Sequence, residues 1–186
     1  MIILEGIRRS GKSYTIEVLK RHFLNLIYYK DLGMRLISGV VDPDSYAIGR
    51  DLAYAQFLPN LQWNEDFIKR LLFDRSYWST YVYGLSWRDN FSRTFFKEHI
   101  KRVEKIYGDF LKDIKILFIT LTEDDMKKIE LMDRKKDRWE NTHSDYRIQY
   151  KLYNKLFDIS NAKIFTLDAF KNEDYIVKTF NNVLND

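Results

Sequence analysis

The sequence predicts an α/β fold in which helices flank a five-stranded parallel sheet. Apolar runs typical of buried strands alternate with stretches of helical period, which indicates βαβ units rather than a bundle or a sandwich. A glycine-containing loop follows the first apolar run, as in doubly wound sheets that bind ligands at the carboxyl ends of their strands. With 186 residues and no internal repeat or linker, the chain is expected to form one domain, residues 1–186.

Five strands are expected. Four apolar runs, each ending at polar or glycine residues, predict strands at residues 2–5, 71–74, 115–121 and 163–167. A further strand lies between residues 26 and 41, and two placements compete. It spans 26–30 if the first helix is short, which we favour, or 35–41 if that helix continues to Gly33.

Helices fill the gaps between the strands, and their apolar stripes are interpreted as core-facing. A helical stretch, Tyr14, Ile16–Val18 and Leu19, follows the glycine-containing loop and predicts the first helix. One apolar stripe, behind a Ser92 cap, consists of Phe96, Ile100, Val103, Tyr107 and Phe110. A second follows the capping-box pattern of Thr142 and Asp145 and consists of Tyr146, Tyr150, Tyr153 and Phe157. The last, behind Asn172, consists of Ile176, Val177, Phe180, Val183 and Leu184.

The composition limits the classes of protein to consider. There is no cysteine, so disulfides and thiolate metal sites are excluded. The N-terminal apolar run stops after four residues, and no later run approaches the roughly 20 residues that span a membrane, so we expect a cytoplasmic protein without a membrane partner. A net charge of +4 is small for a nucleic-acid binder but suits an enzyme that attracts polyanionic substrates such as nucleotides.

Residues 6–13, GIRRSGKS, match the pattern G-x-x-x-x-G-K-[ST] between a predicted strand and a predicted helix. In that setting backbone N–H groups can wrap around a phosphate at a helix N-terminus. Lys12 would then bridge the terminal phosphates, and the Ser13 hydroxyl would be a ligand of Mg²⁺. The rival interpretation is a tight strand-to-helix turn without a ligand.

A second candidate feature, Asp74-Arg75, ends the strand predicted at residues 71–74. In a parallel sheet this position faces the same edge as the phosphate loop. The acid can hold Mg²⁺, directly or through water, or accept a hydroxyl proton, while the guanidinium can grip a phosphate bidentately. An isolated Asp-Arg pair is more often a surface pair or a cap, so the position carries the argument.

A third feature is the basic stretch MDRKKDRWEN, in which Arg134 and Arg138 lie four residues apart and share one face if the segment is helical. Phosphoryl transfer spreads negative charge over the equatorial oxygens, and a short mobile lid carrying cations can close over them. We place this lid at residues 132–142. A solvated charged face is the alternative.

Together these residues resemble thymidylate kinases, within the nucleoside and nucleoside-monophosphate kinases of the P-loop kinase fold. The resemblance rests on Leu4-Glu5-Gly6-Ile7 with the loop, on Asp74-Arg75 with Ser79 and Tyr83-Gly84, and on Asp137-Arg138-Trp139-Glu140-Asn141. It runs over nearly the whole chain but is loose between residues 30 and 70. It implies that Mg²⁺-dependent transfer of the ATP γ-phosphoryl group uses Arg75 on the acceptor phosphate and Arg134 and Arg138 as the lid. The ATP-binding residues it implies are Gly6, Arg8, Arg9, Ser10, Gly11, Lys12, Ser13 and Tyr14.

The two loop arginines differ in what the resemblance implies. Some thymidylate kinases have an arginine at the position of Arg9 that reaches the transferring phosphoryl group, so Arg9 joins Lys12, Asp74 and Arg75 as a catalytic candidate. Arg8 departs from the family, which usually has an aspartate there that recognises a sugar hydroxyl. A cation at this position favours additional phosphate, so Arg8 indicates an acceptor or a pose different from ordinary dTMP.

The resemblance places the acceptor pocket in residues 41–60 and near Arg75 and Tyr83. Tyr54 and Gln56 could supply a stacking ring and an amide that pairs with a pyrimidine edge. Phe57 could stack as well, although core packing is an equal alternative for both aromatic residues. Arg50 could meet the acceptor phosphate, and whether Asp31 or Asp42 closes the second strand stays open.

The sequence therefore predicts an ATP- and Mg²⁺-dependent kinase of a deoxynucleoside monophosphate, with a pyrimidine such as dTMP preferred. The first alternative is a kinase of a nucleoside or of a hydroxyl on a polynucleotide, with DNA as the acceptor. The second is a P-loop switch that binds nucleotide without phosphorylating a small molecule. Homodimerisation stays open.

Overall fold

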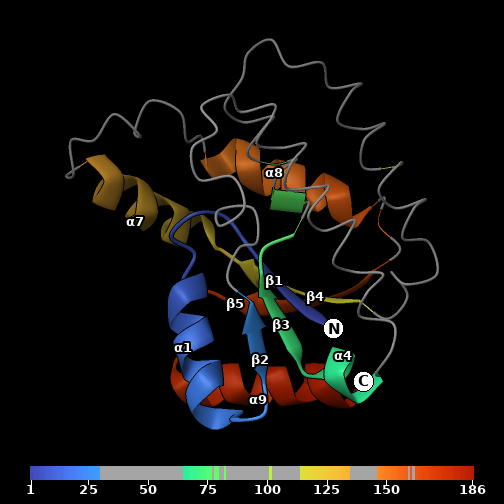
Figure 1. The fold of residues 1–186 in the computed structure, drawn as a ribbon. Helices are drawn as coiled ribbons and strands as arrows, with labels where there is room; N and C mark the ends of the chain where they lie inside the picture. The colour runs from blue at the N-terminus through green and yellow to red at the C-terminus, as the bar shows by residue number, and fades with distance from the viewer. Residues whose placement is uncertain are drawn as a thin grey trace, which may run out of the picture.

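A computed structural model of the chain describes residues 1–29, 65–76, 78, 79, 82, 101, 114–134, 146–158, 160 and 162–186 (Figure 1). Within these residues a five-stranded sheet forms in the order β2-β3-β1-β4-β5. Its strands are β1 (Ile2–Glu5), β2 (Ile27–Tyr29), β3 (Leu71–Asp74), β4 (Lys115–Thr120) and β5 (Lys163–Asp168). Every neighbouring pair is parallel, so the predicted five-stranded parallel sheet is confirmed.

The strand predictions agree with the structure to within a residue or two at their ends. β1 and β3 have the predicted bounds, whereas β4 ends one residue earlier and β5 one residue later than predicted. β2 lies inside the favoured placement, residues 26–30. The alternative placement, 35–41, lies outside the described residues.

Five helices have described bounds: α1 (Lys12–His22), α4 (Glu65–Lys69), α7 (Glu123–Arg134), α8 (Tyr146–Phe157) and α9 (Glu173–Asn185). The Asn172 side chain caps α9 by accepting a hydrogen bond from the Tyr175 backbone N–H at 3.0 Å, as predicted. α7 begins with a capping box that the sequence analysis missed: Thr122 and Asp125 exchange side-chain to backbone hydrogen bonds at 3.1 and 3.2 Å. Within the predicted helix at residues 96–110 only Lys101 is described, and it is helical; the predicted Thr142–Asp145 box lies outside the described residues.

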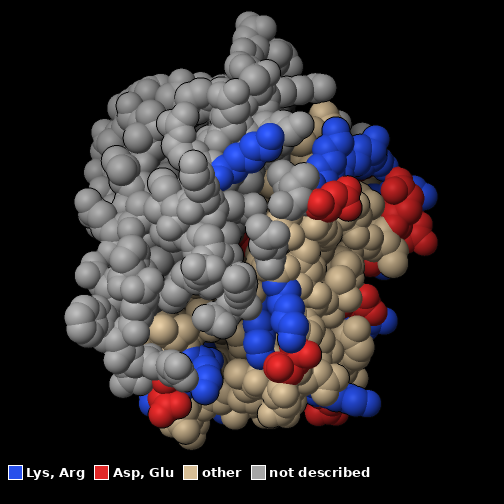
Figure 2. Space-filling model, turned by 90° about the vertical axis from the view of Figure 1, so that its right-hand side faces the viewer, with Lys and Arg blue, Asp and Glu red and all other residues tan. Residues whose placement is uncertain are grey.

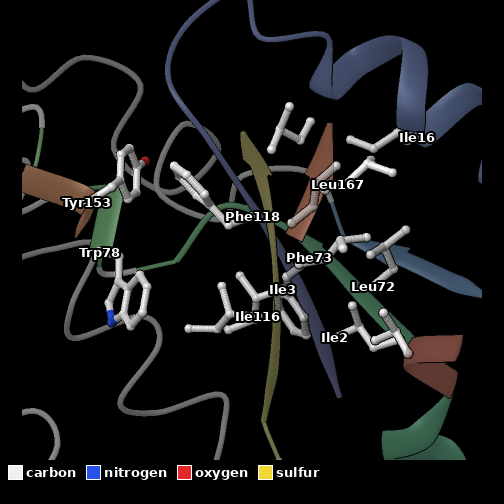
Figure 3. Close-up of a cluster of buried hydrophobic side chains, with 14 of the residues drawn as sticks. Ile2, Ile3, Ile16, Leu72, Phe73, Trp78, Ile116, Phe118, Tyr153 and Leu167 are labelled. Carbon is white, nitrogen blue, oxygen red and sulfur yellow. The ribbon is translucent and has the colours of Figure 1, made fainter. Parts of the chain in front are cut away.

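The sheet is covered on both faces, which explains why its central strands are apolar without alternation. Figure 1 shows α8 on one face and α1 and α9 on the other. In Figure 3, Trp78 and Tyr153 lie with Phe118 on one side of the strands, and Ile16 and Leu167 lie on the other. Phe118 packs against the α8 rings at centroid distances of 4.7–5.7 Å. On the opposite face Phe23 and Phe180 join α1 to α9 at 4.9 Å.

The described surface carries both signs of charge. Figure 2 shows Lys and Arg side chains close to Asp and Glu on one face of the molecule. Among the described residues, Arg147 and Glu130 form an ion pair at 2.6 Å, and Arg21 and Glu173 form another at 2.6 Å. Among the described helices, none has the length and apolar character needed to cross a membrane.

Candidate functional site

The loop after β1 is a tight turn whose geometry requires glycine. Gly6 has φ +153°, and a Cβ at this residue would lie 2.8 Å from Ser10 Oγ and 3.2 Å from Ile119 Cβ. Arg9 and Gly11 also have positive φ, 64° and 96°, and Gly11 is the N-cap of α1. The loop therefore turns tightly into the start of α1, and the Ser10 backbone N–H donates to the Ile7 carbonyl at 3.3 Å.

Lys12 fills the inside of this loop. Its side chain is almost fully buried, with 7% exposure, and its Nζ donates hydrogen bonds to the carbonyl oxygens of Gly6 and Ile7, each at 2.6 Å. These bonds offset the cost of burying the ammonium. α1 has no acid in its first turn, so the positive end of the helix dipole and the lysine both favour negative charge at the loop.

The end of β3 lies directly beside the end of β1. Asp74 pairs with Leu4 in the sheet register, and the Arg75 backbone N–H donates to the Leu4 carbonyl at 3.0 Å. Since Leu4 is two residues from the first loop glycine, Asp74 and Arg75 face the same edge as the phosphate loop. This juxtaposition is the one that the parallel sheet predicted.

The two oxygens of Asp74 have different surroundings. Oδ2 accepts a hydrogen bond from the Tyr28 hydroxyl at 3.3 Å, whereas Oδ1 is buried and has no hydrogen-bond partner among the described residues. A buried carboxylate oxygen without a donor suits a metal ion or a proton. Asp74 and the exposed Ser13 hydroxyl are thus hard oxygen donors of the kind that Mg²⁺ prefers, and the two residues fit such an ion.

Arg75 has a left-handed backbone conformation, and its side chain contacts Ser79. Its φ is +78°, a left-handed conformation that costs a non-glycine residue free energy. Its guanidinium is half-buried, and Nη1 lies 3.4 Å from Ser79 Oγ. The turn after β3 thus directs a cation along the edge of the sheet.

A fully buried carboxylate, Glu5, ties this edge together. Its Oε1 accepts from the backbone N–H and the hydroxyl of Ser76 at 2.7 and 2.6 Å. Its Oε2 accepts from Ser79 at 2.7 Å and from the Tyr153 hydroxyl of α8 at 3.0 Å. The network joins the start of the phosphate loop, the turn that carries Arg75 and a helix on one face of the sheet. This role of Glu5 was not predicted, although an acid at the end of an apolar strand is a signal that the sequence contains.

Two adjoining hollows open beside the loop that connects β5 to α9, and both are lined by residues 168–171. The smaller, about 370 Å³, is also lined by Ser10, Gly11 and Tyr14 of the phosphate loop and α1. The larger, about 550 Å³, reaches the end of β4 and the first turns of α7. No sequence motif marks residues 168–171, so neither hollow was predicted.

Two acids at the start of α7, Glu123 and Asp125, have lowered pKa values. The hydrogen bond from the Thr122 hydroxyl lowers the pKa of Asp125, a residue that lines the larger hollow. A hydrogen bond from Arg147 of α8, followed by its charge, lowers the pKa of Glu123. Arg147 thereby links α7 to α8 on either side of the predicted lid.

The remaining site predictions divide by whether the described residues include them. The structure brings the loop residues, Asp74 and Arg75 to one edge of the sheet, with Arg8 and Arg9 half-buried in the loop. Arg134 is the last residue of α7. The other predicted site residues lie outside the described residues: Arg50, Tyr54, Gln56, Phe57, Tyr83 and Arg138.

No protein-family model matches the chain. No curated protein matches it either. Solved structures do. The YorR protein from Bacillus subtilis, in complex with phosphorylated GDP, superposes with a TM-score of 0.63 at 16% identity, over 99% of this chain and 95% of that one. Deoxyadenosine kinase from M. mycoides with bound dATP gives a TM-score of 0.60 at 14% identity, over 100% and 99% of the two chains. Thymidylate kinase from Candida albicans gives 0.60 at 16% identity, over 99% and 90%.

The chain therefore has the fold of P-loop nucleoside and nucleotide kinases. At this level of identity the likeness establishes the fold and leaves the chemistry to the residues of this chain.

Proposed function

We propose that this protein is a phosphotransferase that moves the γ-phosphoryl group of ATP to a deoxynucleoside monophosphate, with a pyrimidine as the acceptor base. The observation that carries the proposal is the placement of Asp74 and Arg75 beside the phosphate loop, through the Arg75 N–H bond to Leu4. A phosphate-binding loop alone holds a nucleotide. A second cation and a carboxylate at the same edge supply what a transfer reaction additionally needs.

On the donor side, the loop N–H groups and Lys12 hold the β- and γ-phosphates. The Lys12 ammonium lies inside the loop already, so little reorganisation is needed when the nucleotide binds. Ser13 and Asp74 would hold Mg²⁺, which when bound neutralises charge on the phosphates. The smaller hollow next to the loop has room for the nucleoside part of the donor.

On the acceptor side, Arg75 binds the acceptor phosphate and orients its attacking oxygen toward the γ-phosphoryl group. Arg9, and Arg134 with Arg138 in the lid, meet the charge that spreads over the transferring group. The fold also supports a monophosphate acceptor, since the thymidylate kinase of Candida albicans superposes over almost the whole chain.

A second candidate, phosphorylation of a hydroxyl on a nucleoside or on DNA, is favoured by one observation. Asp74 Oδ1 is buried and has no hydrogen-bond partner among the described residues, so it is able to take the proton that a hydroxyl releases. An acceptor phosphate needs no such base. Arg8 also supports the second candidate, because an additional cation suits acceptors with additional phosphates.

The test is a phosphoryl-transfer assay with labelled ATP and a panel of deoxynucleoside monophosphates, nucleosides and short oligonucleotides. Label on a monophosphate supports the proposal, and label on a nucleoside or an oligonucleotide supports the second candidate. Nucleotide binding without transfer to any acceptor would indicate a P-loop switch and refute both.

Lys12→Ala is the matching variant. We expect kcat to fall by about 10²–10³, the cost of removing one preorganised group that stabilises the transition state. Lys178→Ala, which removes an exposed lysine of α9, is the control and should leave turnover unchanged. Circular dichroism checks that Lys12→Ala is folded, and a folded variant with normal turnover would contradict the proposal.

A further inference from the structure

Glu5, the last residue of β1, is a buried acid whose hydrogen-bond partners among the described residues are all neutral. Its donors are the backbone N–H and the hydroxyl of Ser76, the Ser79 hydroxyl and the Tyr153 hydroxyl. Burial of a charge costs free energy, and a well-packed neutral side chain in its place often leaves a fold equally stable or more stable. Stability alone therefore does not explain why this position, with 0% exposure, holds an acid.

The turn that contains Arg75 is anchored to the end of β1 on both sides. The Arg75 backbone N–H donates to the carbonyl of Leu4, the residue before Glu5, at 3.0 Å. The next residue, Ser76, donates two hydrogen bonds to Glu5 Oε1, at 2.7 and 2.6 Å. Between them Arg75 has φ +78°, a conformation that persists only where the surroundings impose it. The bonds on each side of Arg75 thus fix the direction in which its side chain leaves the turn.

Ser79 connects Glu5 to the Arg75 side chain. A serine hydroxyl has one proton to donate and accepts with its lone pairs, whereas a carboxylate only accepts. The Ser79 hydroxyl donates its proton to Glu5 Oε2 at 2.7 Å, so its oxygen is left as an acceptor for Arg75 Nη1, which lies 3.4 Å away. Glu5 therefore sets the direction of the hydroxyl that the guanidinium contacts.

We infer that Glu5 is a positioning residue for the acceptor phosphate: it orients the Arg75 guanidinium through Ser79 and the turn that carries Arg75 through Ser76. The inference rests on the proposed function, in which Arg75 binds the acceptor phosphate, and adds the group that holds Arg75 in place. Because Glu5 is fully buried, it acts through Arg75 and not on the nucleotide itself. A misplaced guanidinium loses its paired hydrogen bonds to a phosphate, so the acceptor, and not ATP, is the substrate whose affinity depends on Glu5.

The experiment compares the two substrates. Isothermal titration calorimetry measures binding of dTMP, and of ATP with Mg²⁺, to the wild type and to Ser79→Ala. We expect the Kd for dTMP to rise about tenfold, as loss of one hydrogen bond to a charged group predicts, and the Kd for ATP to stay within twofold. Glu5→Gln keeps the shape of the side chain but turns an acceptor into an amide donor, so it should weaken dTMP binding by a similar factor. If Glu5→Gln does not fold, Ser79→Ala decides the test.

Val183→Ala is the control for lost stability. Val183 is fully buried in α9, and its carbonyl accepts a hydrogen bond from Lys115 Nζ at 2.7 Å. Since Lys115 begins β4, Val183 lies at the sheet edge opposite the phosphate loop. This variant opens a cavity in the core and destabilises the fold, yet the Kd values for dTMP and ATP should both stay within twofold.

A double-mutant cycle shows whether Ser79 acts through Arg75. Arg75→Ala should raise the Kd for dTMP at least as much as Ser79→Ala does. Adding Ser79→Ala to Arg75→Ala should then change this Kd by less than twofold, because no guanidinium remains to be positioned. A separate structural effect of Ser79 would instead give the same factor in both backgrounds.

The outcomes are distinguishable. Unchanged dTMP affinity in Ser79→Ala or in a folded Glu5→Gln, an equal loss of ATP affinity, or additive effects in the cycle would overturn the inference while leaving the proposed function intact. A wild type that binds ATP but not dTMP would refute the proposed acceptor, and the inference with it.

Discussion

The Glu5 network provides a prediction about stability that two tyrosines of the same helix can test. Tyr146 and Tyr153 both lie on the buried face of α8. The Tyr153 hydroxyl contacts Glu5 Oε2 at 3.0 Å and Ser79 Oγ at 2.9 Å. The Tyr146 hydroxyl is equally buried but has no hydrogen-bond partner among the described residues. Replacement by phenylalanine removes one oxygen in each case and leaves the ring packing in place.

The expected magnitudes differ in sign as well as in size. Tyr153→Phe removes a donor from a buried carboxylate, and hydrogen bonds to charged groups contribute about 1.5–3 kcal/mol. Glu5 keeps three donors, two from Ser76 and one from Ser79, so we expect the lower end, about 1.5 kcal/mol of destabilisation. Tyr146→Phe removes a hydroxyl that is desolvated without compensation, so it should be neutral or stabilise the fold by up to about 1 kcal/mol.

The assay is urea denaturation of both variants and the wild type, followed by circular dichroism. The slope of the unfolding free energy against urea concentration is compared between them. We expect the free energies of unfolding of the two variants to differ by at least about 1.5 kcal/mol, with similar slopes. Equal effects in the two variants would refute the reasoning, since they would mean that the Tyr153 hydroxyl contributes no more than an unpaired one.

Three further predictions concern charge. Removing either Arg134 or Arg138 should depress kcat more than it weakens nucleotide binding, because the charge they meet develops in the transition state; a change in KM alone would contradict the lid. Arg8→Asp should lower kcat/KM for a short oligonucleotide relative to that for dTMP, and the same factor for both would assign Arg8 to the donor phosphates or to solvent. Thr122→Ala should cost about 1 kcal/mol at pH 7. Because the Thr122 hydroxyl lowers the pKa of Asp125 below its usual 3.8, part of that difference should persist above pH 3.8 and disappear as the pH falls further, measured by urea denaturation at pH 7 and pH 3.

Local signals were sufficient for the sheet and the phosphate loop. Residues 2–5 and 71–74 are short apolar runs because central strands of a parallel sheet are buried on both faces, and each run ends where the chain reaches the polar edge. The loop pattern requires glycine at two positions, Gly6 and Gly11, and both have positive φ in the structure. The pattern therefore predicted where the backbone adopts this conformation. Asn172 likewise predicted the start of α9, because asparagine is a favoured N-cap residue.

Hydrogen bonds between side chains far apart in the sequence could not be predicted. Glu5 meets Ser76 and Tyr153 across 71 and 148 residues, and no local pattern says which distant hydroxyls satisfy a buried acid. The left-handed backbone of Phe170, with φ +57°, was missed for a different reason, since a single aromatic residue after a strand gives no sign of its φ. The strand after the first helix stayed open because an edge strand of three residues, Ile27–Tyr29, has too few positions for a period to show.

Backbone strain offers a way to read the site that is independent of the motif. Among the described residues, the non-glycine residues with positive φ are Arg9, Arg75 and Phe170. They follow β1, β3 and β5, so all three lie at the carboxyl edge of the parallel sheet, where ligands bind in this class of fold. Two carry the guanidinium groups that the proposed reaction needs near phosphate, and the third carries an exposed ring beside a hollow. Glycine would make each of these turns at less cost, so we expect that replacing Arg9 or Arg75 by glycine stabilises the fold while it weakens phosphoryl transfer.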